Sequence, residues 1–161
     1  PTQGIAYLKD KDLLSFFSLA TAAIALFHSA IEYRVNHTIE KAEKIEYHQK
    51  KKIKLFTIGN FTLSLRRNMQ LTKEQLLFLP LREKLTKIVP LVTQKETPAN
   101  QPFWPTFIEL EMLRDDVIHA TRQKTYGANR QSNSVFGKLI DVDFMQIENG
   151  TRQLLNYIQG H

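Results

Sequence analysis

The chain has 161 residues, which suits one folded domain spanning 1–161. Hydrophobic residues make up 42% and charged residues 24%, which is the composition of a globular protein and excludes a disordered chain. Cysteine is absent, so disulfides, thiolate metal sites and cysteine nucleophiles are excluded. The formal net charge of +6 favours an anionic partner, with nucleic acid first among the candidates.

A long helix is the first predicted element, from Asp12 to Gln49 without proline or glycine. Its apolar residues recur at spacings of three and four. Leu13 to Ile31 lacks formal charge over about 19 positions, which meets the simple length test for a membrane span. Polar residues interrupt this stretch, and charges of both signs flank it without an aromatic belt. We therefore expect a helix buried in a bundle or dimer seam, in a cytoplasmic protein without a membrane partner.

The segment from His48 to Gln70 breaks the helical pattern with β-branched and aromatic residues around Gly59 and Asn60. We expect an irregular basic insertion around 50–70, either a hairpin-like excursion or a loop. Its cations lie near aromatic residues, a mixture that can hold phosphates and stack bases. Lysines at the C-terminal end of a helix also interact favourably with the negative end of the helix dipole. This stabilising role is the alternative to RNA binding for the lysine run. The RNA-binding candidates in this segment are Lys50, Lys51, Lys52, Lys54, Arg66 and Arg67.

Shorter helices are predicted after this segment. Thr72 and Gln75 form a capping box, and Pro80 and Pro90 should split the following apolar stretch into short helices. The polar residues 93–102 have the composition of an exposed connector.

Two further helices are predicted in the last third of the chain. One opens at Trp104, with Thr106 and Glu109 as a second capping box, and ends near Gly127. The other starts after Asp143 as its cap, and Gly150 weakens its middle.

The helix that begins at Trp104 carries the residues best suited to acid–base chemistry. Asp115 and His119 are four apart and stack on one face, and Arg122 continues that face. Arg114 lies about 140° around the helix from His119, at about 100° per residue. Only its long side chain, a kinked helix or a second subunit brings Arg114 to the histidine, and a symmetric dimer solves this geometry.

The stretch "RDDVIH", Arg114 to His119, resembles the signature of the HEPN superfamily: an arginine, a polar residue directly after it, and a histidine four to six positions beyond the arginine. The motif's position late in a helical chain, after a long alanine-rich helix, is also similar to HEPN proteins. The resemblance implies an all-α fold, an up-and-down bundle of four or five helices. It also implies a homodimer that brings two motifs into one cleft.

Many HEPN proteins are metal-independent ribonucleases in toxin–antitoxin or other defence systems, and others keep the fold without cleavage. If the activity carries over, His119 is the general acid–base group and Arg114 stabilises charge on the phosphoryl oxygens. Asp115 orients the imidazole, and Arg122 joins the RNA-binding candidates. We expect no cofactor and no metal. The expected partners are a second copy, RNA substrate, and an antitoxin or other partner protein.

Other hypotheses stay open at this stage. A catalytically silent HEPN-like module for protein assembly or RNA binding has the same fold. A metal nuclease could use Glu109, Asp116 and His119, which share one broad helix face. In an unrelated helical protein, Arg114 and His119 merely face solvent. His28, within the apolar stretch of the first helix, is expected to be a hydrogen-bonded core residue rather than a ligand.

Overall fold

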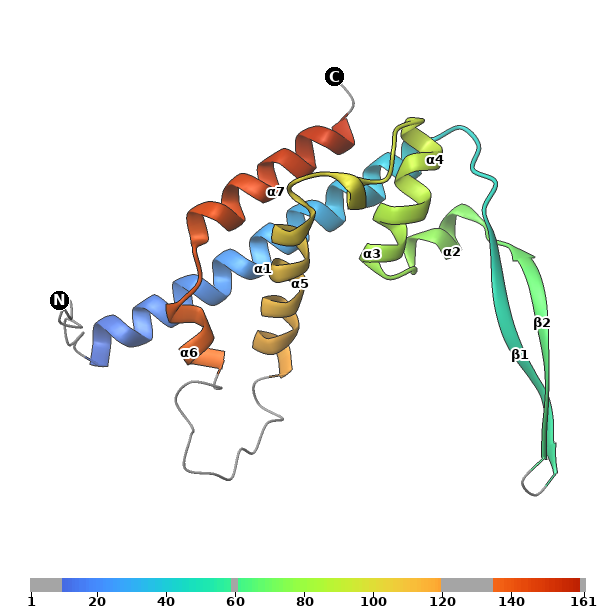
Figure 1. Ribbon diagram of the computed structural model, residues 1–161, viewed down its shortest axis with the longest axis horizontal. Helices are drawn as coiled ribbons and strands as arrows, with labels where there is room; N and C mark the ends of the chain where they lie inside the picture. Colours follow the sequence, from blue (N-terminus) through green and yellow to red (C-terminus); the bar gives the residue numbers. More distant parts are fainter. Residues whose placement is uncertain (1–9, 59–60, 120–134, 160–161) are drawn as a thin grey trace. The chain divides into compact units, whose positions relative to one another are not determined.

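The computed structural model describes residues 10–58, 61–119 and 135–159 (Figure 1). The chain divides into two compact units. Unit 1 comprises Pro1–Glu32 and Gln101–Tyr157, and unit 2 comprises Tyr33–Asn100 and Ile158–His161. The expected mostly helical fold is confirmed, since the described residues add only one two-stranded sheet to the helices. One domain over 1–161 stays a prediction.

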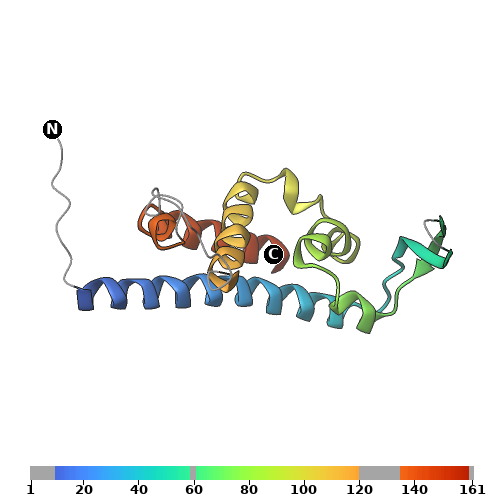
Figure 2. The same cartoon turned by 90° about the horizontal axis from the view of Figure 1, so that it is seen from below.

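Helix α1 spans Asp10–Lys41 and is unbroken along its whole length (Figure 2). Most of its predicted apolar stripe is confirmed, because the following side chains are buried: Ala20, Ile24, Ile31, Val35 and Ile39. Phe27 of that stripe is only half-buried, and its last two members, Ala42 and Ile45, lie beyond the helix. The helix ends at Lys41 and not at Gln49 as predicted. Backbone pairing explains the difference: from His48 on the chain forms a strand, and just before it the carbonyl of Tyr47 accepts a hydrogen bond from the Leu71 amide (3.0 Å).

Unit 1 is built from the first part of α1 with α5 (Trp104–His119), α6 (Val135–Ile140) and α7 (Phe144–Gln159). Phe16 of α1 meets Phe144 of α7 edge-on, with ring centroids 6.4 Å apart. Lys138 of α6 forms an ion pair of 2.5 Å with Asp116 of α5. The buried side chains of α5 and α7 complete a helical core: Phe107, Leu110, Leu113, Ile147 and Leu154.

Helices α5 and α7 approach closely at Gly150. A Cβ atom added there would lie 2.6 Å from Thr106 Cγ2, so only glycine fits without movement. Thr106 is therefore a buried interior residue of α5, and its predicted role in a capping box is wrong. The predicted end of this helix near Gly127 lies outside the described residues.

The predicted N-terminal caps are confirmed in two other helices. The backbone amide of Gln146 donates a 3.0 Å hydrogen bond to Asp143 Oδ1, which caps α7 as predicted. In unit 2, α2 (Lys73–Leu77) has the full capping box: the Gln75 amide donates to Thr72 Oγ1, and the Thr72 amide donates to Gln75 Oε1. Both patterns depend only on residues three apart, which is why the sequence reveals them.

Pro80 separates α2 from the next helix, as predicted, but Pro90 does not split that helix. Helical structure continues through α3 (Leu81–Glu83), the π-helical segment η1 (Lys84–Ile88) and α4 (Val89–Thr93). The Val89 amide donates to the carbonyl of Lys84, a π-type bond just before the proline. A π segment accommodates an interruption of the usual hydrogen-bond ladder, so the prediction of a break at Pro90 is wrong. A single 3-10 turn, η2 (Pro98–Asn100), lies within the expected connector.

The insertion around 50–70 is a two-stranded hairpin, so the hairpin alternative is confirmed and the loop alternative is wrong. Strand β1 (His48–Ile58) pairs antiparallel with β2 (Phe61–Gln70), from His48 opposite Gln70 to Ile58 opposite Phe61. The register shifts once, between Lys54 and Phe56. A continuous ladder satisfies the backbone groups of this stretch, which a loop would leave to water.

Hydrogen bonds to Glu83 attach the base of the hairpin to α3. Tyr47 Oη donates to Glu83 Oε1 at 2.9 Å, and Gln49 Nε2 donates to the same oxygen at 3.4 Å. Lys87 forms an ion pair with that carboxylate at 3.2 Å. Close by in unit 2, the buried amine of Lys84 donates to Asn36 Oδ1 of α1 at 2.8 Å.

By length and composition, Asp12–Lys41 meets the criteria for a helix that can cross a membrane. A core helix of a soluble protein meets the same criteria. Within α1, Leu14, Leu19 and Leu26 are exposed, whereas the stripe described above is buried. The expectation of a cytoplasmic protein without a membrane partner therefore stays a prediction.

The Gly150→Ala variant tests the contact between α5 and α7. The added methyl group overpacks against Thr106, so we expect unfolding free energy to fall by about 1–3 kcal/mol. This loss outweighs the helix-propensity gain of about 1 kcal/mol from alanine. The double variant Thr106→Ala/Gly150→Ala should recover most of the loss in urea unfolding. Equal stability of Gly150→Ala and the parent would contradict the close approach.

Candidate functional site

The predicted motif lies in the last turns of α5 that the structure describes. Asp115 and His119 are exposed, and Arg114 is half-buried. Arg122 lies outside the described residues. Two of the three predicted catalytic side chains are thus open to solvent and to a ligand.

Arg114 and Asp115 form an ion pair with each other. Arg114 Nη1 donates to Asp115 Oδ1 at 2.9 Å. The side chains of Asp115 and His119, both described, form no hydrogen bond with each other, although the two residues are four apart on one helix. The pair between exposed partners is weak, so it does not prevent Asp115 from turning to the imidazole. The expected role of Asp115 in orienting His119 stays a prediction.

One copy of α5 does not bring Arg114 and His119 together. The helix is regular from Trp104 to His119, so the two residues stay about 140° apart around its axis. Arg114 flanks the buried side defined by Leu110 and Leu113, whereas His119 lies on the exposed side. The prediction that a kinked helix could bring Arg114 to His119 is therefore wrong within the described part of α5.

Arg114 meets α1 in a small pocket of unit 1. This pocket, of about 170 Å³, combines a histidine, a carboxylate and a guanidinium between the two helices. Its lining residues are Ile24, Ala25, His28, Ser29, Glu32, Arg114, Val117 and Ile118. Sequence reasoning missed this grouping because it joins helices far apart in the chain. The visible sign was that His28 sits on the buried stripe of α1, between Ile24 and Ile31.

His28 is 8% exposed, so the expectation of a core position is confirmed. Burial lowers the pKa of His28 from its ordinary value of 6.5, and the positive charge of Arg114 lowers it further. Three carboxylates, Glu32, Glu111 and Asp115, act in the opposite direction without reversing the shift. The imidazole is therefore neutral near pH 7, with one nitrogen able to accept a proton or a hydrogen bond.

The metal-nuclease hypothesis needs Glu109, Asp116 and His119 to gather. Asp116 is instead engaged by Lys138 of α6 at 2.5 Å. Over residues 10–58, 61–119 and 135–159, no group of three or more His, Asp or Glu side chains is arranged to hold a metal ion. The described geometry gives this hypothesis no support.

The hairpin gathers the predicted RNA-binding residues on a two-stranded ribbon. Its register pairs Lys50 with Asn68, Lys52 with Arg66 and Lys54 with Ser64, and directly paired positions of the same parity belong to one face of the ribbon. Four cationic positions therefore share a face: Lys50, Lys52, Lys54 and Arg66.

The opposite face of the ribbon is mixed. Lys51 pairs with Arg67, and the neighbouring pairs on this face are Ile53 with Leu65, which is apolar, and Gln49 with Met69, which is mixed. Lys50, Lys51 and Arg67 are exposed. A cationic face and a partly apolar face on one ribbon suit a nucleic-acid strand, whose phosphates and bases need the two kinds of contact.

Comparison of the chain with protein-family models, with curated proteins and with solved structures finds no match. The function is therefore argued from the residues and geometry of the sites. Three groups matter for it: the exposed end of α5, the pocket between α1 and α5, and the basic hairpin.

The titration of His28 tests the pocket between α1 and α5. Followed by NMR, its midpoint should lie below 6.5, and Arg114→Gln should move it upward because a nearby positive charge is removed. Arg152→Gln, on the exposed surface of α7, should leave it unchanged. Because the folded-state pKa is depressed, the stability that neutral His28 contributes is complete above pH 6.5 and is lost as pH falls through its folded pKa. An unchanged midpoint in Arg114→Gln would show that the two residues do not share a pocket.

Proposed function

We propose that the protein is a metal-independent RNA endonuclease of HEPN type that acts as a homodimer. The observation that carries the proposal is the placement of the motif: Asp115 and His119 are exposed on the last turns of α5, with Arg114 beside a polar pocket. The surrounding helices of unit 1 provide a rigid support for these side chains. The resemblance of "RDDVIH" to the HEPN signature supplies the reaction type.

His119 is the general acid–base group in this proposal. Its imidazole accepts the proton of an RNA 2′-hydroxyl while that oxygen attacks the adjacent phosphorus. The bond from phosphorus to the 5′-oxygen breaks, and the leaving oxygen takes up a proton. The products are a 2′,3′-cyclic phosphate and a 5′-hydroxyl. Because the nucleophile belongs to the substrate, DNA is not cleaved.

Arg114 stabilises the charge that builds on the phosphoryl oxygens. A guanidinium keeps its charge and offers a planar set of donors that matches two phosphate oxygens. In the unliganded chain Asp115 occupies one of these donors at 2.9 Å. An incoming phosphate replaces that carboxylate as the partner of Arg114, which frees Asp115 to accept a hydrogen bond from His119.

A second copy completes the site, because Arg114 and His119 are on different sides of one regular helix. Met112 lies three residues before Asp115 and is 61% exposed, which places an apolar side chain on the same face as His119. Packing of this face against its counterpart in a symmetric dimer buries Met112. Arg114 lies about 140° around the helix from this face, so its long side chain must extend around the helix to reach the histidine of the other copy.

The hairpin provides contacts to the RNA backbone through its cationic face. The exposed Lys50, Lys51 and Arg67 attract phosphate without reading the sequence, which suits a ribonuclease of broad specificity. A role as toxin or defence effector, with an antitoxin or other partner protein, rests on the resemblance alone. A silent HEPN-like module is the alternative if cleavage is absent.

Cleavage of end-labelled RNA in EDTA tests the proposal. The parent protein should produce 2′,3′-cyclic phosphate ends, and His119→Ala should lose at least about a hundredfold in rate. Arg114→Ala should lose as much, because its charge contacts the reacting phosphate. Arg152→Ala is the matched control, since Arg152 also pairs with a neighbouring acid, at 2.6 Å, on the exposed face of α7. Absence of cleavage by the folded parent, or cleavage only with added metal, would overturn the proposal.

A further inference from the structure

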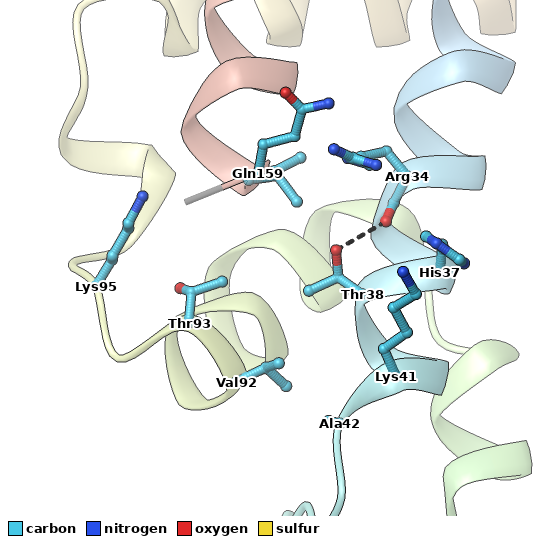
Figure 3. A pocket seen from close by; sticks show the side chains of 10 residues that line it. Arg34, His37, Thr38, Lys41, Ala42, Val92, Thr93, Lys95 and Gln159 are labelled. Carbon is cyan, nitrogen blue, oxygen red and sulfur yellow. Dashed lines mark hydrogen bonds between the residues drawn. The ribbon is translucent and has the colours of Figure 1, made fainter. Parts of the chain in front are cut away.

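Unit 2 contains a separate pocket of about 420 Å³. It lies where the end of α1 meets the end of α4 and the last residues of α7, as Figure 3 shows. Cationic and neutral polar side chains line much of it, and none of the described residues that line it carries a carboxylate. The lining residues are Arg34, His37, Thr38, Lys41, Ala42, Val92, Thr93, Lys95, Ile158 and Gln159.

The cations reach this pocket from two segments. On α1, Arg34, His37 and Lys41 are three and four residues apart and so share one face of the helix. Across the pocket, Gln94 has a left-handed backbone with φ of 56°, which ends α4 and is costly for a residue other than glycine. Lys95 follows directly. The strained turn thus brings a further cation to the same pocket as Arg34 and Lys41 of α1.

The threonine hydroxyls of the pocket donate their protons to the helix backbone. Thr38 Oγ1 donates to the carbonyl of Arg34 at 3.0 Å, and Thr93 Oγ1 donates to the carbonyl of Val89 at 2.8 Å. The donors that remain for a ligand include Arg34, Lys41 and the side-chain amide of Gln159. A set of charged donors selects an anion.

Several cations elsewhere in the described residues are paired with acids. Lys44, Lys87, Lys138 and Arg152 each form an ion pair with a carboxylate. Within the described residues, Arg34, His37 and Lys41 form no such pair. Like charges that gather without a counter-ion repel one another, so this arrangement is stabilised when an anion enters.

We propose that this pocket binds the terminal phosphate of a nucleotide. A phosphate monoester carries up to two negative charges and accepts the paired donors of a guanidinium together with lysine ammonium groups. The remaining walls include Ala42, Val92 and Ile158, which offer an apolar surface for a sugar or base. The volume of about 420 Å³ falls within the usual range of small-molecule sites. The ligand is a free nucleotide or the 5′-phosphate end of an RNA.

Calorimetric titration of the full chain in EDTA tests the proposal, with adenosine 5′-monophosphate, inorganic phosphate and adenosine as probes. The monophosphate should bind and adenosine should not. Arg34→Gln and Lys41→Gln should each weaken binding about tenfold, as expected for loss of a charge-assisted hydrogen bond. The control Arg152→Gln removes one charge from the exposed face of α7 and should leave this affinity unchanged. No binding by the folded parent, or equal weakening in the control, would overturn the proposal.

RNA oligonucleotides with and without a 5′-phosphate distinguish the two sources. A preference for the phosphorylated RNA that Arg34→Gln removes assigns the pocket to RNA ends. Binding of the free monophosphate with no such preference assigns it to a free nucleotide, and either result supports the site. The readout is binding and not cleavage, so the absence of ribonuclease activity in the parent would leave this test unaffected.

Discussion

The buried stripe of α1 is the feature on which both units depend. Ile24 and Ile31 belong to the core of unit 1, and Val35 and Ile39 continue the same stripe within unit 2. Complete burial of each such side chain contributes roughly 1.5–3 kcal/mol. A stripe at spacings of three and four over 32 residues thus supports two sets of packed helices with one element.

The same helix positions polar groups beside that stripe. His28 is on the buried side in unit 1, where burial and Arg114 keep its imidazole neutral. In unit 2 the neighbouring helix face presents Arg34, His37 and Lys41 to a pocket without a described carboxylate. The different surroundings along α1 therefore produce two kinds of site. One has a neutral imidazole suited to hydrogen bonding, and the other has a cluster of cations suited to an anion. The two sites are separate in chemistry and in the residues that form them.

Local patterns predicted much of the fold, and contacts between distant segments explain what was missed. The caps at Thr72 and Asp143 need only a neighbour three residues on, so the sequence revealed them. The same pattern at Thr106 misled, because packing against Gly150 decides that position. The sequence does not distinguish a hairpin from a loop at 50–70, because the hydrogen bonds that anchor the hairpin to Glu83 join segments far apart in the chain.

In the candidate sites, too, local patterns were predictable from the sequence and contacts between distant segments were not. The exposure of Asp115 and His119 agrees with their distance from the apolar stripe of α5, which the sequence displays. The presence of Arg114 and His28 in one pocket, and of Lys95 and Arg34 in another, depends on tertiary packing and was not predicted. The basic residues of the insertion were identified from composition, whereas their distribution over two faces required the strand register.

The central claim is that each ribonuclease site of the proposed dimer combines Arg114 from one copy with His119 from the other, so that the parent dimer has two such sites. Mixing the inactive variants Arg114→Ala and His119→Ala, under conditions in which subunits exchange, tests it directly. About half of the dimers are then mixed, and each holds one intact composite site, so we expect roughly a quarter of the parent's cleavage rate. A mixture as inactive as its two components, with exchange verified by native mass spectrometry, would contradict the account.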